Sequence, residues 1–159
     1  MISSQNKFKV VLSGVNINEA GQLKVFKEMI NAFLKKNVHL ICIVNDIRLF
    51  KSYDNQKIEF IEFPEIKKSW FSRLKFEFFD IKKISTDINA DIWINMQDIS
   101  ANTVCKNSFV YCHNPSMFAE KSFSYLFYDW KFFLWNYLYK YLYKINITSN
   151  NAVIVQQEW

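Results

Sequence analysis

A histidine stands directly after an apolar run, and it has the clearest potential for chemistry in the chain. Residues 109–113 read FVYCH, and Asn114, Pro115 and Ser116 follow. An imidazole titrates near neutral pH and offers a donor and an acceptor, so it suits proton transfer or contact with a polar ligand. Pro115 restricts Asn114 to extended backbone, which limits the movement of the ring. His113 is therefore the candidate catalytic residue, and a structural hydrogen bond is the alternative.

A second candidate is the loop at residues 14–22, GVNINEAGQ, which holds both glycines of the chain. Glycine lets the backbone approach a ligand closely, and the helix expected after the loop directs free N–H groups toward an anion. The candidate substrate contacts here are Gly14, Asn16, Gly21 and Gln22. Because the loop is neither a GxGxxG nor a Walker sequence, a loop that needs glycine only for turning is the alternative.

A third polar loop, NMQDIS, follows the apolar segment DIWIN at residues 91–95. Ligands of open parallel sheets bind outside the carboxyl ends of the strands, so Asp98 is a candidate substrate contact. An aspartate in a loop also serves as a turn or cap residue, which is the alternative. Asn114 and Ser116, which follow the histidine, complete the candidate contacts.

The three cysteines indicate neither a disulfide framework nor a metal site. Cys42 and Cys112 lie in apolar runs and Cys105 in a polar loop, and their odd number indicates reduced thiols in the cytosol. Cys105, Cys112 and His113 would give three metal ligands with no CxxC or HxxxH to complete the set, so we expect no metal. No Ser/His/Asp catalytic set can be assembled either.

Composition limits the remaining classes of function. The 159 residues correspond to one domain, and the net charge of +5 is spread among acids rather than gathered into a basic stripe. We therefore expect no nucleic-acid partner. The N-terminal apolar stretch is too short for a signal peptide, and no segment is long and apolar enough to span a bilayer. A cytoplasmic protein is expected.

Apolar periodicity predicts alternating strands and helices. The six expected strands are 8–13, 38–44, 58–63, 91–95, 108–112 and 152–156. An amphipathic helix is expected over 23–35, another after an N-cap at Ser69, and a long aromatic helix within 122–145. Continuous apolar strands of this kind are covered on both faces. The pattern predicts an α/β fold with a Rossmann-like, doubly wound, mostly parallel sheet of about six strands.

The aromatic helix is apolar on two sides. One stripe, which the sheet is expected to cover, is Trp130, Leu134, Tyr137, Leu138, Tyr141 and Ile145. A second flank contains Phe132, Trp135, Tyr139 and Tyr143, close to Lys131, Lys140 and Lys144. Since a surface helix buries one face, the second flank predicts a partner, which is another domain, another subunit or a membrane interface. A deeply buried core helix is the alternative.

Several segments together resemble the amino-terminal domain of bacterial glycosyltransferase family 4 enzymes. The segments are KVVLSGVNINEAGQLKVFKEMINAFLKK, ADIWIN, FVYCHNPS, LFYDWKFFLWNYLYKYLYKIN and VIVQQEW. The resemblance covers nearly the whole chain. It implies one half of a GT-B fold, in which two Rossmann-like domains face each other across a cleft.

The resemblance also implies roles for individual residues. His113 matches the histidine after the fifth strand, which approaches the transferred sugar. Gly21 matches a glycine near the donor diphosphate, where family members often have a Gly-Gly pair in place of Ala20–Gly21. Family members retain anomeric configuration without a metal, and no cofactor is expected, because the nucleotide-sugar is a substrate.

Residues 1–159 are therefore expected to be the acceptor-side domain of a hexosyltransferase of polysaccharide, capsule or lipopolysaccharide biosynthesis. Its expected partners are a carboxy-terminal GT-B domain that binds the donor and a glycan or lipid-linked acceptor. Peripheral contact with the inner face of the cytoplasmic membrane is a further expectation. The isolated chain is expected to be inactive. The alternative is a non-catalytic Rossmann-like module that docks a partner protein or a membrane through its aromatic helix.

Overall fold

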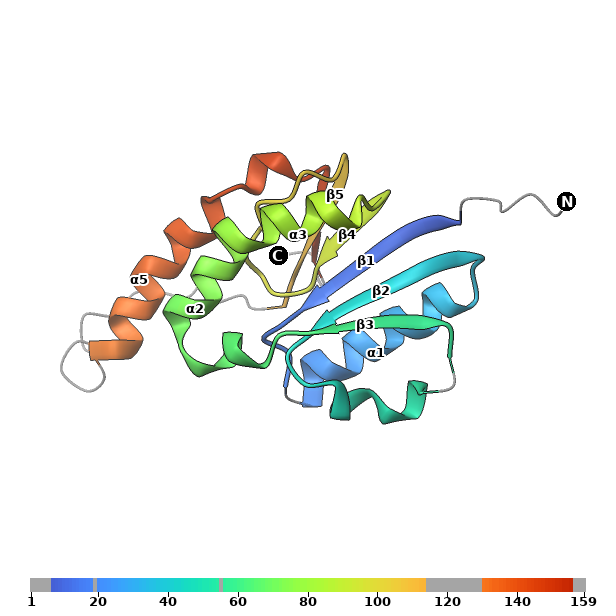
Figure 1. Ribbon diagram of the computed structural model, residues 1–159. Coiled ribbons are helices and arrows are strands. Elements are labelled where there is room, and N and C mark those ends of the chain that lie inside the picture. The colour runs from blue at the N-terminus through green and yellow to red at the C-terminus, as the bar shows by residue number, and fades with distance from the viewer. Residues whose placement is uncertain (1–6, 19, 55, 114–129, 156–159) are drawn as a thin grey trace, which may run out of the picture.

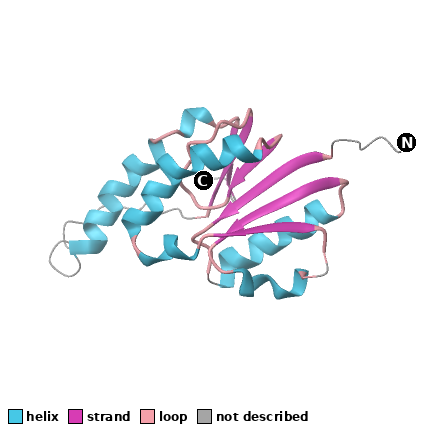
Figure 2. Ribbon diagram, viewed as in Figure 1, coloured by secondary structure: helices cyan, strands magenta, loops and turns pink. Residues whose placement is uncertain are grey.

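Six parallel strands form one sheet with helices on both faces (Figure 1, Figure 2). The computed structural model describes residues 7–18, 20–54, 56–113 and 130–155. The strands are β1 (Phe8–Gly14), β2 (Val38–Val44), β3 (Ile58–Glu62), β4 (Ile92–Asn95), β5 (Asn107–Cys112) and β6 (Ala152–Val155). Their order across the sheet is β3-β2-β1-β4-β5-β6, and each neighbouring pair is parallel. The predicted fold class is confirmed.

Helical segments connect the strands. They are α1 (Ala20–Leu34), the 3₁₀ segments η1 (Ile47–Tyr53), η2 (Pro64–Lys68) and η5 (Ile147–Ser149), α2 (Trp70–Lys75), a π-helical turn η3 (Phe76–Asp80), α3 (Ile81–Ile88) and α5 (Trp130–Lys144). Ser69 caps α2 as predicted, because its hydroxyl accepts a hydrogen bond of 3.0 Å from the backbone N–H of Ser72.

Two apolar layers pack against the sheet, one on each face. On one face, Phe26 and Ile30 of α1 and Phe50 of η1 pack against strand residues such as Leu12. On the other face, residues of η3 and α3 pack against the alternate strand positions, with Trp93 of β4 completely buried. The period of two along each strand supplies both layers, which is why the strands read as continuous apolar runs.

Helix α5 lies beside α2, on the face opposite α1 (Figure 1). Tyr139 and Tyr143 are each only 2% exposed, so the prediction that they form an exposed flank was wrong. They pack in a cluster with Ile99, Leu142, Trp70, Leu74 and Phe78. The side chains of Lys131, Phe132 and Trp135 lie outside the described part of the chain.

The opposite stripe of α5, which the sheet was expected to cover, is exposed instead. Its described members are Trp130, Tyr137, Leu138, Tyr141 and Ile145. The physical reason is that α2 and η3, rather than the strands, supply the apolar surface against which α5 packs. Lys140 and Lys144 are exposed, as predicted.

Candidate functional site

The centre of the candidate site is the junction between β1 and β4. The chain places β1, β2 and β3 outward in one direction, and then returns to place β4, β5 and β6 outward in the other. The strand order therefore reverses between β1 and β4, and the carboxyl ends of such a pair are where open α/β sheets bind ligands. The loops that leave β1 and β4 at this edge contain two of the three polar segments singled out in the sequence.

A polar cavity of about 160 Å³ lies at this edge. Its lining residues are Asn16, Ile17, Gln22, Arg73, Gln97, Asp98 and Tyr139. A wider hollow of about 440 Å³, lined by Asn16, Asn18, Gly21 and Gln22, shares two of these residues and lies at the N-terminus of α1. Loops from β1 and β4 and helices α1, α2 and α5 thus contribute side chains to one continuous polar region.

Four predicted contacts lie in this region, namely Asn16, Gly21, Gln22 and Asp98. Gly14 lines neither hollow. A Cβ at Gly14 would lie 2.6 Å from Cε2 of Phe26 and 2.9 Å from Cδ1 of Ile17, so this glycine makes room for packed side chains. Asn114 and Ser116 lie outside the described residues.

Asp98 connects the cavity to the end of β5. Its carboxylate oxygen Oδ1 accepts a hydrogen bond from the backbone N–H of His113, and Oδ2 lies 3.4 Å from the hydroxyl of Tyr139, which donates to it. The backbone N–H of Asp98 donates to the carbonyl of Tyr111 at 3.2 Å. The residue has φ of 66°, a left-handed conformation that aspartate tolerates better than most residues. Asp98 thus has a turn role as well as a place in the cavity wall.

His113 is half-buried and follows the last residue of β5, at the edge of the sheet that holds the cavity. Its ring lies 4.6 Å from the Tyr111 ring, between centroids, and a ring N–H donates to the backbone carbonyl of Met96. Burial lowers the pKa of His113, while the charge of Asp98 and the bond to Met96 oppose that fall. Among the described residues Nε2 has no hydrogen-bond partner, although it is buried.

An uncharged imidazole with a bare nitrogen can accept a hydrogen bond or a proton from a ligand. The backbone N–H of His113 donates directly to the carboxylate of Asp98, which lines the cavity. His113 itself lines neither hollow and its Nε2 is buried, so the structure connects this residue to the cavity only through the bond from its backbone to Asp98.

Arg73 supplies a buried cation to the cavity wall. It lies on α2 and is only 8% exposed, and its Nη2 donates to the backbone carbonyl of Gln97 at 2.9 Å. Within the described residues, Nε of Arg73 and Oε1 of Gln97 are buried and have no hydrogen-bond partner. The wall of the cavity thus contains a buried donor and a buried acceptor whose hydrogen-bonding capacity the described side chains leave unused.

Beneath the cavity lies a buried network around Glu77, a residue of the π-helical turn. The side-chain amide of Gln97 donates to Oε1 of Glu77, and that of Asn95 donates to Oε2 at 3.3 Å. The Gln97 amide also donates to Oδ1 of Asn95 at 3.2 Å. Burial raises the pKa of Glu77 to about 7, although the charge of Arg73 and the two amides oppose this rise. The network fixes the orientation of Gln97 in the cavity wall.

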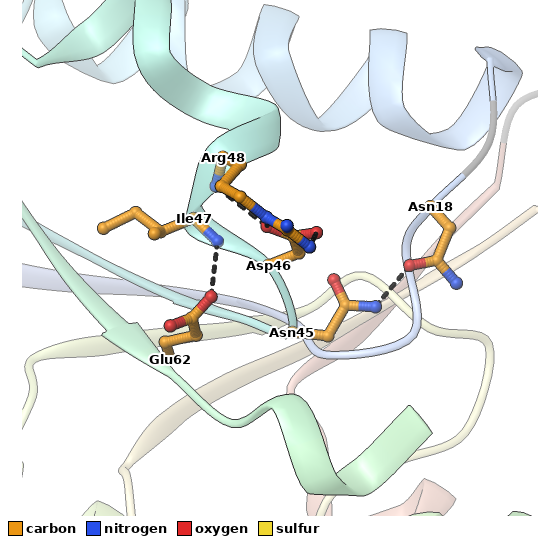
Figure 3. Close-up of polar contacts among 6 residues, drawn as sticks. All are labelled: Asn18, Asn45, Asp46, Ile47, Arg48 and Glu62. Carbon is orange, nitrogen blue, oxygen red and sulfur yellow. Dashed lines mark hydrogen bonds and ion pairs between the residues drawn. The ribbon is translucent and has the colours of Figure 1, made fainter. Parts of the chain in front are cut away.

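A second set of polar contacts connects the neighbouring loops (Figure 3). Nδ2 of Asn45, at the end of β2, donates to Oδ1 of Asn18 in the loop after β1. Oε1 of Glu62 accepts from the backbone N–H of Ile47 at 2.9 Å, which joins the end of β3 to the start of η1. The bond between Asn45 and Asn18 holds the loop that carries Asn16 and Asn18 against the end of β2.

The sequence prediction missed Arg73, Glu77, Asn95 and Gln97. Arg73 and Glu77 are a basic and an acidic residue four positions apart on a helix, a spacing typical of an exposed ion pair. Gln97 lies beside the predicted Asp98, so its place in the same loop was the available signal. Nothing in the residue types indicates the π-helical turn, which places Glu77 under the cavity.

Comparisons of the chain with protein-family models, with curated proteins and with solved structures gave no significant match. Among the described residues, no cluster of His, Cys, Asp and Glu is arranged to hold a metal ion. Within the same residues, no helix has both the length and the apolar character that crossing a bilayer requires.

Proposed function

We propose that residues 1–159 form the acceptor-side domain of a retaining glycosyltransferase. The enzyme transfers a sugar from a nucleotide-sugar to a cell-envelope or lipid-linked glycan at the inner face of the cytoplasmic membrane. The donor is bound mainly by a second GT-B domain. The observation that carries the proposal is the polar cavity at the β1–β4 junction, where Asn16, Gln22, Arg73, Gln97 and Asp98 converge.

Amide, carboxylate and guanidinium groups around a cavity of about 160 Å³ suit a ligand with many hydroxyl groups. The acceptor sugar occupies this cavity, whose wall includes the side chains of Arg73 and Gln97. For His113 to contact the transferred sugar, Nε2, which is buried in this structure, must become exposed when the sugar binds. Catalysis comes mainly from orientation of the donor and acceptor, with His113 as a polar contact that stabilises the transition state.

The binding test is an NMR titration of the 1–159 chain with single monosaccharides, namely glucose, galactose, mannose and their N-acetylated and uronic forms. At least one sugar is expected to shift the Nε–H signal of Arg73 and the side-chain amide signals of Gln97 and Gln22. Gln22→Ala should weaken binding, whereas Gln56→Ala, at an exposed position away from the cavity, should not. Absence of shifts for every sugar, with a folded spectrum, would contradict the proposal.

The catalytic test needs a gene product in which residues 1–159 are joined to a donor-binding domain. There, His113→Ala is expected to lower kcat by roughly 100-fold, since a positioned polar group contributes about this much. Unchanged kinetics would return His113 to a structural role. The 1–159 chain alone is expected to show no turnover of a nucleotide-sugar, because the resemblance places the donor site in the second domain.

A non-catalytic binding module is the second candidate. The observation that favours it is the exposed aromatic face of α5, which needs no reaction to explain it. Binding of a partner by α5 together with no response of the cavity to any sugar would favour this function.

A further inference from the structure

We infer that the exposed face of α5 docks the protein on an anionic lipid surface. The face consists of Trp130, Tyr137, Leu138, Tyr141 and Ile145, and we call it the outer face of α5. This inference extends the membrane location in the proposed function, but its test does not depend on the reaction, because it concerns a different surface from the cavity.

The first argument is the position of the outer face. Helical spacing of about 100° per residue puts the four residues within α5 on one third of the helix circumference, and Ile145 directly follows the helix. Tyr139 and Tyr143 lie on the opposite side and pack against α2. Tyr137 and Tyr141 are 47% and 50% exposed although their rings lie only 5.8 Å apart, so they form one continuous aromatic surface. A helix with one face already buried does not need this second apolar face for folding.

The second argument is charge. Lys140 and Lys144 are exposed and adjoin the outer face on the helix circumference. The sequence of α5, WKFFLWNYLYKYLYK, contains three lysines and no acidic residue. A protein partner of this surface would need acidic groups around an apolar centre, whereas an anionic bilayer presents negative headgroups next to acyl chains along the whole helix.

The third argument is residue type. Tryptophan and tyrosine have an apolar ring and a polar edge, and they concentrate where headgroups meet acyl chains. Lysine reaches the headgroups while its methylene stem stays near the apolar layer. Trp130, Tyr137 and Tyr141 together with Lys140 and Lys144 therefore match the chemistry of a lipid–water interface. The helix would lie parallel to the membrane plane without crossing it.

The test is co-sedimentation of the 1–159 chain with vesicles of phosphatidylcholine alone and with vesicles that also contain phosphatidylglycerol. We expect binding to the anionic vesicles that weakens as salt is raised. The triple variant Tyr137→Ser, Leu138→Ser, Tyr141→Ser should abolish binding to the anionic vesicles. The double variant Lys140→Gln, Lys144→Gln should weaken binding to anionic vesicles roughly 30-fold, from about 1 kcal/mol per lysine near the surface.

The matched control is Phe71→Ser. Phe71 is 79% exposed on α2 and lies outside the outer face, so this variant should bind vesicles as the unmodified chain does. Circular dichroism of each variant checks that it is folded. Failure of the folded, unmodified chain to bind anionic vesicles would overturn the inference, as would equal weakening by Phe71→Ser. A dimer detected by light scattering that the triple variant dissociates would assign the outer face to a second copy of the chain instead.

Discussion

The backbone N–H of His113 donates a hydrogen bond to Oδ1 of Asp98, and this bond joins the tip of β5 to the loop after β4. The two residues are fifteen positions apart in the sequence and follow the neighbouring strands β4 and β5. The same carboxylate also accepts from Tyr139 and lines the cavity. A substitution of Asp98 should therefore affect the imidazole of His113 as well as the cavity wall.

Asp98→Asn tests the electrostatic part of this relationship. Asparagine keeps an oxygen that can accept from His113 but removes the negative charge, which opposes the effect of burial on the His113 pKa. The pKa of His113 is expected to fall further below its ordinary value. The pH dependence of the imidazole proton signals measures it, and His39 in the same spectrum serves as the internal reference. Asp91→Asn, at the amino end of β4, is the control and should leave the His113 titration unchanged.

Glu77→Gln tests the buried network through its effect on stability. Because the Glu77 pKa rises from 4.5 to about 7 on folding, the folded chain holds this proton more tightly than the unfolded chain does. Ionisation of Glu77 should lower the free energy of unfolding progressively as pH rises from 4.5 to about 7, by about 3 kcal/mol in total. Above that range the effect of Glu77 should stay constant.

Urea unfolding of the two proteins across this pH range provides the measurement. Glu77→Gln should lose this fall in stability, because glutamine does not ionise. At low pH the variant should be about 1 kcal/mol less stable than the original chain, since the new NH₂ cannot accept one of the two amide hydrogen bonds. Glu28→Gln, at an exposed position of α1, is the control. An unchanged pH profile in Glu77→Gln would contradict the assignment.

Gly14→Ala should lower the free energy of unfolding by about 1–3 kcal/mol, because the added methyl group would overlap the rings and methyls packed there. Chemical denaturation measures the loss. Phe26→Leu removes the atoms nearest the new Cβ, so the double variant should be more stable than the sum of the two single changes predicts. Strict additivity would show that the overlap is relieved elsewhere.

Gly21→Ala should instead raise the free energy of unfolding. Gly21 lies in the first turn of α1, its φ is not positive, and a Cβ there would meet no atom within 4 Å. Alanine should therefore stabilise the helix by about 0.5–1 kcal/mol. The midpoint of thermal unfolding would report this gain. A loss of stability would mean that the glycine has a structural role in the loop, and a gain that is accompanied by weaker sugar binding would point to close approach of a ligand.

The strands and α1 could be predicted because the spacing of their apolar residues is typical of these elements. VHLICIV is short and apolar at nearly every position, which is typical of a strand covered on both faces, and β2 occupies these residues. The placement of Asn16 and Asp98 at one edge followed from the same topology. A parallel sheet brings the carboxyl ends of its strands together, so loops far apart in sequence meet there.

The faces of α5 could not be predicted in this way. The helix is apolar around most of its circumference, so periodicity leaves two candidate buried faces, and the choice depends on the shape of α2 and η3. Arg73 and Glu77 escaped prediction for a related reason. Their types and spacing suit an exposed helix surface, and only the tertiary packing buries them beneath Gln97.

The π-helical turn between α2 and α3 has a consequence for chain length. Arg73, Glu77, Ile81 and Ser85 are all buried and recur every fourth residue. On a regular α-helix such a series winds around the axis by about 40° at each step, so its ends would leave the side that faces the sheet. The wider turn at Phe76–Asp80 reverses this drift in the middle of the series. Deletion of a single residue from that turn would leave a regular α-helix in which Arg73 and Ser85 are eleven steps apart, which is three turns plus about 20°, so both ends would still face the sheet. This segment should therefore tolerate the loss of one residue, whereas the insertion of one residue would rotate one end by about 100°.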